Sequence, residues 1–286
     1  MAIWLLFLSL LVPFVATAQL PRTGSPLRQV EVYELVGPAP PPALKARAAI
    51  VIDLDTGATL DEVNPRARLA PASLTKVITA LVALDLLSID QPVTVPTSIN
   101  QLPWDSTRMG LRVGERLTVR DLLYGLFLNS GNDAAITLSE AVTSRADFIA
   151  RMNAKAAALG MSDTHFVNPI GLDDPAHYTS AADLAKATIA LRSRFPDVAA
   201  IASVERITVP ATSGHHPYAL YNLNELVRTY PGATGLKTGW TGHAGGCLIA
   251  TASRGGRTIL VVVMGSPRVF QEATALLDYG FATPSP

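Results

Sequence analysis

Apolar residues form short runs near both ends of the chain and longer, alanine-rich stretches between them. The apolar run 48–54 is followed by the turn residues Asp55–Gly57, and residues 58–63 can return beside it as the second strand of a hairpin. Near the C-terminus, three more short apolar runs separated by glycines predict strands that pair successively and antiparallel. These runs are residues 235–240, 246–253 and 258–264.

The middle of the chain has the composition of helices. Residues 73–87 are rich in leucine, alanine and valine, contain no glycine and follow Pro71, so we expect a mostly buried helix there. Gly160 is placed to end another helix over 146–159. Further helices are expected over 117–128, 133–142, 180–191 and 269–279.

This order of elements predicts an α+β fold. Strands at both chain ends imply one antiparallel sheet built from both ends, flanked by helices and packed against a helical lobe. Of the 286 residues, 49% are hydrophobic and only 6% aromatic, so the core must be mainly aliphatic. Lys plus Arg and Asp plus Glu both total 23, and this balance argues against a nucleic-acid-binding protein, which would show a basic surplus.

The beginning of the chain predicts export. Residues 1–18 are apolar and uncharged, and Ala16–Ala18 supply the small-x-small pattern of a signal-peptide cleavage site, although the usual basic n-region is missing. A membrane-spanning helix is the alternative, but the run is short of the ~20 residues that a bilayer needs, and Pro13 interrupts it. Residues 19–45 predict an extended, proline-rich lead-in, and residues 46–286 predict one folded domain.

The cysteine and histidine residues give no sign of metal or disulfide chemistry. Cys247 is the only cysteine, so no intrachain disulfide can form, and its apolar neighbours indicate a small buried side chain. Because no cysteine lies near Ala18, a lipid-anchored lipoprotein is excluded. His215, His216 and His243 lack the i, i+4 spacing and the carboxylate neighbours of a zinc site. We therefore expect no metal and no cofactor.

Three short motifs carry the candidate chemistry. Ser73 and Lys76 are three residues apart on a predicted helix, so the hydroxyl and the amine share one face about one turn apart. A serine hydroxyl is a weak nucleophile until a base takes its proton, and a lysine can be that base when a dry site and a nearby cation lower its pKa. Lys237 could be that cation. The motifs are Ser73-Leu74-Thr75-Lys76, Ser130-Gly131-Asn132 and Lys237-Thr238-Gly239.

Each motif alone is weak evidence. A serine and a lysine at this spacing arise often by chance, Ser130 to Asn132 could simply cap the next helix, and Lys237 to Gly239 could be an ordinary edge strand. Their joint occurrence, in this order on a helix, an interhelical loop and a strand, is the pattern of β-lactamases and penicillin-binding proteins.

The sequence resembles the serine-type D-alanyl-D-alanine carboxypeptidases, the low-molecular-mass penicillin-binding proteins, over roughly residues 46–281. The resemblance implies a β-lactamase-like fold and makes residues 46–286 a peptidase catalytic domain. It also implies removal of the terminal D-alanine from peptidoglycan pentapeptide stems through an acyl-enzyme, with β-lactam antibiotics as covalent inhibitors. The segments that carry it are residues 71–76, 130–134, 168–173, 235–241 and 276–281.

The resemblance also implies catalytic roles. Ser73 would attack the carbonyl of the penultimate D-alanine, and Lys76 would accept the serine proton. Ser130 would relay a proton to the departing amine. Backbone N–H groups of Ser73 and Trp240 would form the oxyanion hole.

For substrate binding, the resemblance implies that Asn132 holds the peptide stem. Lys237 and Thr238 would bind the terminal carboxylate by charge and hydroxyl, and Gly239 and Trp240 would belong to the same substrate-binding strand.

The sequence departs from the better-known members of the family in two respects: its C-terminal end and the position of a carboxylate-binding arginine. The chain stops soon after its last predicted helix, so we expect no C-terminal β-rich domain and no C-terminal membrane anchor. After cleavage of the signal peptide, we expect the protein to be soluble in the periplasm or cell envelope. An arginine that assists carboxylate binding in relatives could correspond to Arg268, but the register leaves a plain surface arginine equally open.

Other acyl-transfer functions remain as alternatives. A D,D-endopeptidase that cuts peptidoglycan crosslinks would carry the same motifs. A class A β-lactamase needs a deacylating glutamate, and none of Glu140, Glu205 and Glu225, the only glutamates between the second and third motifs, has the Glu-x-x-Leu-Asn setting. An inactive binding homologue would be expected to have lost one of the motif residues, and none is lost.

Overall fold

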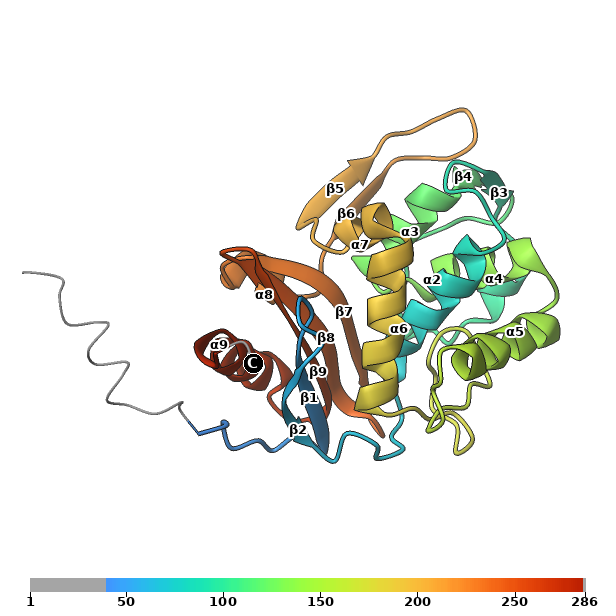
Figure 1. The fold of residues 1–286 in the computed structure, drawn as a ribbon. Coiled ribbons are helices and arrows are strands. Elements are labelled where there is room, and N and C mark those ends of the chain that lie inside the picture. The colour runs from blue at the N-terminus through green and yellow to red at the C-terminus, as the bar shows by residue number, and fades with distance from the viewer. Residues whose placement is uncertain (1–39, 285–286) are drawn as a thin grey trace, which may run out of the picture. The chain divides into compact units, whose positions relative to one another are not determined.

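The computed structural model describes residues 40–284, so the predicted signal peptide 1–18 and most of the predicted lead-in 19–45 lie outside the described residues. Five strands form an antiparallel sheet in the order β2-β1-β9-β8-β7 (Figure 1). They are β1 (Ala48–Asp53), β2 (Thr59–Val63), β7 (Ala233–Thr241), β8 (Gly245–Arg254) and β9 (Arg257–Ser266). Because β1 pairs with β9, both ends of the chain build one sheet, and the predicted fold class is confirmed.

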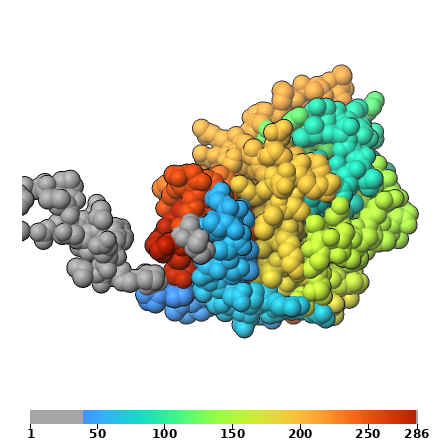
Figure 2. Space-filling model, in the orientation of Figure 1, coloured from blue at the N-terminus to red at the C-terminus, as the bar shows by residue number. Residues whose placement is uncertain are grey.

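The three central strands of the sheet, β1, β9 and β8, are buried on both faces. Along β9, Ile259, Val261 and Val263 point to one face and the residues between them to the other, as the two-residue period of a strand requires. Helix α9 (Val269–Ala282) covers the first face, and α6 (Ala181–Arg194) packs on β1 and β9 from the second (Figure 1). In Figure 2, the yellow surface of α6 lies between the blue β1–β2 hairpin and the green surface of the helical lobe.

The helical lobe is built around a largely aliphatic core. Its other main helices are α2 (Lys76–Leu84), α3 (Val119–Phe127), α4 (Asn132–Val142) and α5 (Arg145–Ala158). Three helices begin with a serine or threonine that accepts the N–H of an aspartate three residues later, a standard helix cap. These pairs are Thr118–Asp121, Ser144–Asp147 and Ser180–Asp183. Within residues 40–284, no helix is long and apolar enough to cross a bilayer.

The predicted helix over 73–87 is wrong at both ends. Ser73 lies in a short 3-10 helix, η1 (Ala72–Thr75), and the α-helix begins at Lys76 and ends at Leu84. Ala72, the first residue of η1, has a φ of +49°, outside the right-handed helical region. The chain therefore turns sharply just before Ser73.

Several short elements were not predicted. The predicted helix over 117–128 begins as a strand, β4 (Arg116–Thr118), which pairs with β3 (Pro92–Thr94). A second small hairpin joins β5 (Arg206–Val209) to β6 (Tyr218–Tyr221). The remaining short helices are η2 (Thr97–Gln101), α7 (Pro196–Ile201) and α8 (Leu226–Thr229).

Candidate active site

Ser73 and Lys76 lie at the junction of η1 and α2. Lys76 Nζ is 2.7 Å from Ser73 Oγ and donates a hydrogen bond to the backbone carbonyl of Ile170 at 2.8 Å. The lysine is fully buried. A neutral amine held in this position can accept the hydroxyl proton of Ser73.

The environment favours the neutral form of this amine. Burial, and after it the charge of Lys237, hold the pKa of Lys76 well below its usual 10.5, whereas the carboxylate of Asp133 acts in the opposite direction. Burial also lowers the pKa of Lys237, to about 7. The fold thus brings the two lysines close enough for one to influence the proton affinity of the other.

The loop that carries Ile170 is organised by one side chain. Asn168 Oδ1 accepts the backbone N–H groups of Ile170, Gly171 and Leu172 at 3.2, 2.7 and 3.2 Å. Gly171 has a φ of +87°, and a Cβ atom there would lie 1.9 Å from the carbonyl oxygen of Ala72. Only glycine allows this loop to approach the Ser73 turn so closely.

A buried histidine supports the same turn. Thr75 Oγ1 donates to the carbonyl of Ala72 at 2.9 Å and lies 2.8 Å from His177 Nε2. His177 Nδ1 accepts the N–H of Val167 at 3.0 Å, so Nε2 carries the ring proton and donates to Thr75. Burial lowers the pKa of His177 to about 4, which keeps the ring neutral at neutral pH. Sequence analysis missed His177 because a single loop histidine has no spacing pattern.

The second motif lies at the start of α4. Ser130 adopts a φ of +56°, and Asn132 is the first residue of the helix. The next residue, Asp133, fixes this region, because its carboxylate accepts four backbone N–H groups. The donors are Met109, Gly110, Leu111 and Ala134, at 2.8, 2.8, 3.0 and 2.9 Å. The motif is therefore tied to the loop that precedes β4.

The third motif lies on β7, the last strand in the sheet order. Lys237 is fully buried and its Nζ donates to the carbonyl of Thr238 at 2.8 Å, whereas Trp240 is 74% exposed. A Cβ atom on Gly239 would lie 3.0 Å from the backbone nitrogen of Ser73. The glycine therefore lets the strand pass directly beside the serine.

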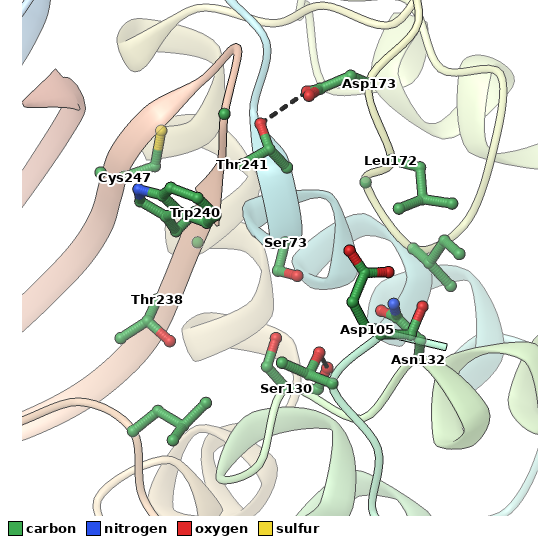
Figure 3. A pocket seen from close by; sticks show the side chains of 18 of the residues that line it. Ser73, Asp105, Ser130, Asn132, Leu172, Asp173, Thr238, Trp240, Thr241 and Cys247 are labelled. Atoms are coloured by element: carbon green, nitrogen blue, oxygen red, sulfur yellow. Dashed lines mark hydrogen bonds between the residues drawn. The ribbon is translucent and has the colours of Figure 1, made fainter. Parts of the chain in front are cut away.

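A pocket of about 570 Å³ opens between these elements (Figure 3). Figure 3 shows Ser73 between the β7 side chains Thr238 and Trp240 and the opposite wall with Ser130 and Asn132. Of the predicted site residues, those that line the pocket are Ser73, Ser130, Asn132, Thr238, Gly239 and Trp240. Lys76 and Lys237 are buried behind its surface.

The structure adds wall residues to which the sequence analysis assigned no role in the site. They are Asp105, Ser106, Thr107, Leu172, Asp173 and Leu223. Thr241 Oγ1 donates to Asp173 at 2.7 Å, which connects β7 to the opposite loop at one end of the pocket (Figure 3). Arg268 is exposed and does not line the pocket, although the next two residues do.

The remaining candidate chemistry concerns metal ligands and the thiol of Cys247. Among residues 40–284, no group of histidine, cysteine, aspartate or glutamate side chains is arranged to hold a metal ion. Cys247 lines the pocket, but burial raises the pKa of its thiol to about 11, so the nucleophilic thiolate is scarce.

Comparison with known proteins gives consistent matches. Residues 36–268 match the family Peptidase_S11, described as D-alanyl-D-alanine carboxypeptidase. The chain is 37% identical over 254 residues to D-alanyl-D-alanine carboxypeptidase DacB2 of Mycobacterium tuberculosis, with 86% of each chain covered. It is 36% identical over 247 residues to D-alanyl-D-alanine carboxypeptidase DacF of Bacillus subtilis, where the match covers 84% of this chain but only 63% of the relative.

Solved structures give the same picture. The Streptomyces K15 DD-transpeptidase superimposes with a TM-score of 0.78 at 31% identity, covering 86% of this chain and 100% of that chain. The arrangement of the sheet and the helical lobe is thus shared with that structure.

Proposed function

This chain belongs to the D-alanyl-D-alanine carboxypeptidase family of serine peptidases, and on that premise we propose that it removes the terminal D-alanine from peptidoglycan pentapeptide stems through an acyl-enzyme on Ser73. The observation that carries the proposal is the pair formed by Ser73 Oγ and the fully buried Lys76 Nζ, 2.7 Å apart at the edge of a pocket. A buried amine with a lowered pKa can accept the proton that a serine hydroxyl must lose to become a nucleophile.

In the acylation step, Ser73 Oγ attacks the carbonyl carbon of the penultimate D-alanine while its proton passes to Lys76 Nζ. The negative charge that develops on the carbonyl oxygen is held by the backbone N–H groups of Ser73 and Trp240. The close passage of β7 beside Ser73 at Gly239 supports this oxyanion hole. The C–N bond then breaks, and Ser130 relays the proton from Lys76 to the amine of the departing D-alanine.

Deacylation repeats these steps with water. A water molecule attacks the ester carbonyl and gives its proton to Lys76, and the ester bond to Ser73 Oγ breaks. The serine oxygen recovers a proton from the lysine, and the shortened stem leaves as a carboxylic acid. A β-lactam would acylate the same oxygen by opening its ring.

Substrate binding uses β7 and the wall opposite it. Because β7 is the last strand of the sheet, its outer backbone groups can pair with an extended peptide. Lys237 and Thr238 bind the terminal carboxylate, and Asn132 holds the stem. A bound carboxylate favours the charged form of Lys237, whose pKa in the free protein is about 7.

Two alternatives share the acylation chemistry. A D,D-endopeptidase would differ only in the length of the leaving group that the pocket admits. A class A β-lactamase is disfavoured because none of the described residues that line the pocket is a glutamate. Glu140 instead accepts a hydrogen bond from Ser98 at 2.7 Å and pairs with Arg145.

We also propose that the protein works outside the cytoplasm, after cleavage behind Ala18, because its substrate is part of the cell wall. N-terminal sequencing of the protein recovered from cells would test this, and finding Met1 on a membrane-bound form would contradict it.

The test of the function is mass spectrometry of purified protein incubated with a pentapeptide stem and, separately, with a crosslinked stem dimer. Loss of one D-alanine from the pentapeptide supports the carboxypeptidase, and separation of the dimer supports the endopeptidase. The Ser73→Ala variant must lose either activity. If both substrates stay intact with the unmodified protein, the proposed function is wrong.

A further inference from the structure

Residues 221–224 reverse the usual distribution of polar and apolar side chains. Asn222 and Asn224 are buried, at 8% and 2% exposure, whereas Tyr221 and Leu223 are 60% and 47% exposed. Large apolar residues are normally inside a protein and asparagines outside. The segment continues β6 from its last residue, and an extended chain places every second side chain on the same face. Leu223 lines the catalytic pocket, so this exposed leucine faces the substrate.

The two buried asparagines fix the backbone of Leu223. Asn222 Nδ2 donates to the carbonyl of Ala202 at 2.9 Å, and Asn222 Oδ1 accepts the N–H of Asn224 at 2.9 Å. The N–H of Leu223 donates to the carbonyl of Leu128 at 3.0 Å. The leucine is thus held in place before a substrate binds, which lowers the entropy cost of using it.

These contacts place Leu223 at the Lys237 end of the pocket. Ala202, which accepts the hydrogen bond of Asn222, also lies against the first part of β7. A Cβ atom on Gly235 would lie 2.8 Å from Ala202 Cβ, and Gly235 comes two residues before Lys237 along the strand. The leucine therefore belongs to the end of the pocket that β7 reaches first.

This end of the pocket receives the departing residue of the substrate. In the proposed mechanism, Lys237 and Thr238 hold the terminal carboxylate, and Ser130 protonates the departing amine. Figure 3 shows Thr238 and Ser130 at the end of the pocket away from Thr241. The α-carbon of the departing residue carries one more substituent besides hydrogen, its side chain. Since Thr238 and Ser130 serve the carboxylate and the amine, Leu223 supplies the apolar surface that this side chain meets.

An apolar surface discriminates between side chains through their hydration. A methyl group gains free energy when it leaves water against a leucine, whereas an ammonium or amide group loses hydration there without gaining a hydrogen bond. Burying one group of the size of a methylene changes a rate or equilibrium constant by about fourfold. Because its backbone is fixed, Leu223 cannot retreat to admit a longer side chain.

Resting on the proposed function, we propose that Leu223 is a specificity residue for the departing residue of the substrate. It favours a small apolar side chain, that of D-alanine, over a long polar one. A peptidoglycan crosslink, in which the departing amine belongs to the long side chain of a neighbouring stem, is therefore the poorer substrate. Leu223 thereby directs the shared acyl-enzyme chemistry toward carboxypeptidase and away from endopeptidase activity.

The first test uses peptides that differ only in the departing residue: Nα,Nε-diacetyl-L-lysyl-D-alanine followed by D-alanine, glycine or D-lysine. The measured quantity is the ratio of kcat/KM values for two peptides in one preparation, from which the amount of folded protein cancels. In Leu223→Ala, the preference for D-alanine over glycine should fall by about fourfold, because the methyl group loses its apolar contact. Leu223→Met keeps a flexible apolar side chain and should retain the preference.

A charged variant and a matched control separate recognition from structure. Leu223→Asp should raise the rate for D-lysine relative to D-alanine by about fivefold, the range of an exposed ion pair, and the gain should shrink at high salt. Leu86→Ala is the control, because Leu86 is 48% exposed, almost the same as Leu223, but does not line the catalytic pocket. This control should leave every ratio unchanged.

The second test compares a pentapeptide stem with a crosslinked stem dimer. The unmodified protein should cleave the pentapeptide faster, and Leu223→Ala should reduce that difference, because the shorter side chain leaves room for the longer departing group.

The possible failures are distinguishable. The inference is overturned, while the acyl-enzyme chemistry stands, if Leu223→Ala keeps the unmodified preference for D-alanine over glycine. It is also overturned if Leu86→Ala changes the ratios equally, or if the unmodified protein cleaves the dimer as fast as the pentapeptide. If no peptide loses its last residue and the dimer stays intact, the proposed function itself fails.

Discussion

The contact between Gly171 and the Ser73 turn gives a sharp prediction for the variant Gly171→Ala. A Cβ atom at this position would lie 1.9 Å from the carbonyl oxygen of Ala72, 2.4 Å from its carbon and 3.0 Å from the nitrogen of Ser73. All three atoms belong to the peptide unit that orients the nucleophile. The added methyl group therefore presses on the part of the backbone that positions Ser73.

The size of the effect follows from these distances. Since Cβ contacts below 3.0 Å essentially do not occur, the loop and the turn must separate by about 1 Å. A displacement of this size at the reacting groups lowers a rate by about 100-fold. The φ of +87° adds strain of about 1–2 kcal/mol for alanine, so the melting temperature should fall by roughly 3 °C or more.

The assay is the second-order rate constant for covalent labelling by a fluorescent penicillin, with thermal unfolding measured in parallel. Gly160→Ala is the matched control, because Gly160 has a similar φ of +67° but nothing within 4 Å of its added Cβ atom. The control should lose stability through backbone strain and keep its labelling rate. Labelling of Gly171→Ala within about threefold of the unmodified protein would refute the reasoning.

Three further predictions concern the motif residues. Ser73→Ala should abolish penicillin labelling at an unchanged melting temperature, and a labelled variant would show that another residue is the nucleophile. Lys76→Arg should lower the acylation rate by about 1,000-fold, since a guanidinium cannot act as a base, whereas Lys237→Arg keeps the charge and should retain measurable acylation. Similar rates for these two variants would mean that the base is assigned wrongly. Acylation should rise with pH through the pKa of Lys76, because only the neutral amine accepts a proton. Lys237→Met removes the like charge that lowers this pKa, so the acidic limb of the rate profile should move to higher pH. An acidic limb that stays in place would contradict this coupling.

The long, strongly patterned segments were predictable from the sequence. Residues 258–264 alternate between two apolar faces, and residues 133–142 and 146–159 read as helices, so strand and helix were assigned correctly. The pairing of the first and last strands followed from their places in the chain. The three motifs could be found because each is a local pattern that the sequence carries by itself.

The features that were missed depend on contacts between distant residues. The turn at Ala72 is set by Gly171 and by the hydrogen bonds of His177, about a hundred residues away, so local pattern could only suggest a regular helix. Strand β5 has only four residues and is a strand because it pairs with β6, which its own sequence pattern does not reveal. Asp105 lies in a loop without periodicity, and only its attachment to the second motif brings it to the pocket.

The assembly of the site from distant parts of the chain has a practical consequence. Lys76 and its partner Ile170 are 94 residues apart, and Lys237 lies on a strand near the other end of the chain. Segments so far apart meet only when the whole domain has folded. Closing such long loops costs conformational entropy, and only the completed packing offsets that cost. The amount of covalently bound β-lactam should therefore equal the amount of native protein. The labelled fraction of a preparation would report refolding yield, and labelling with time would report how quickly nascent or denatured chains become competent.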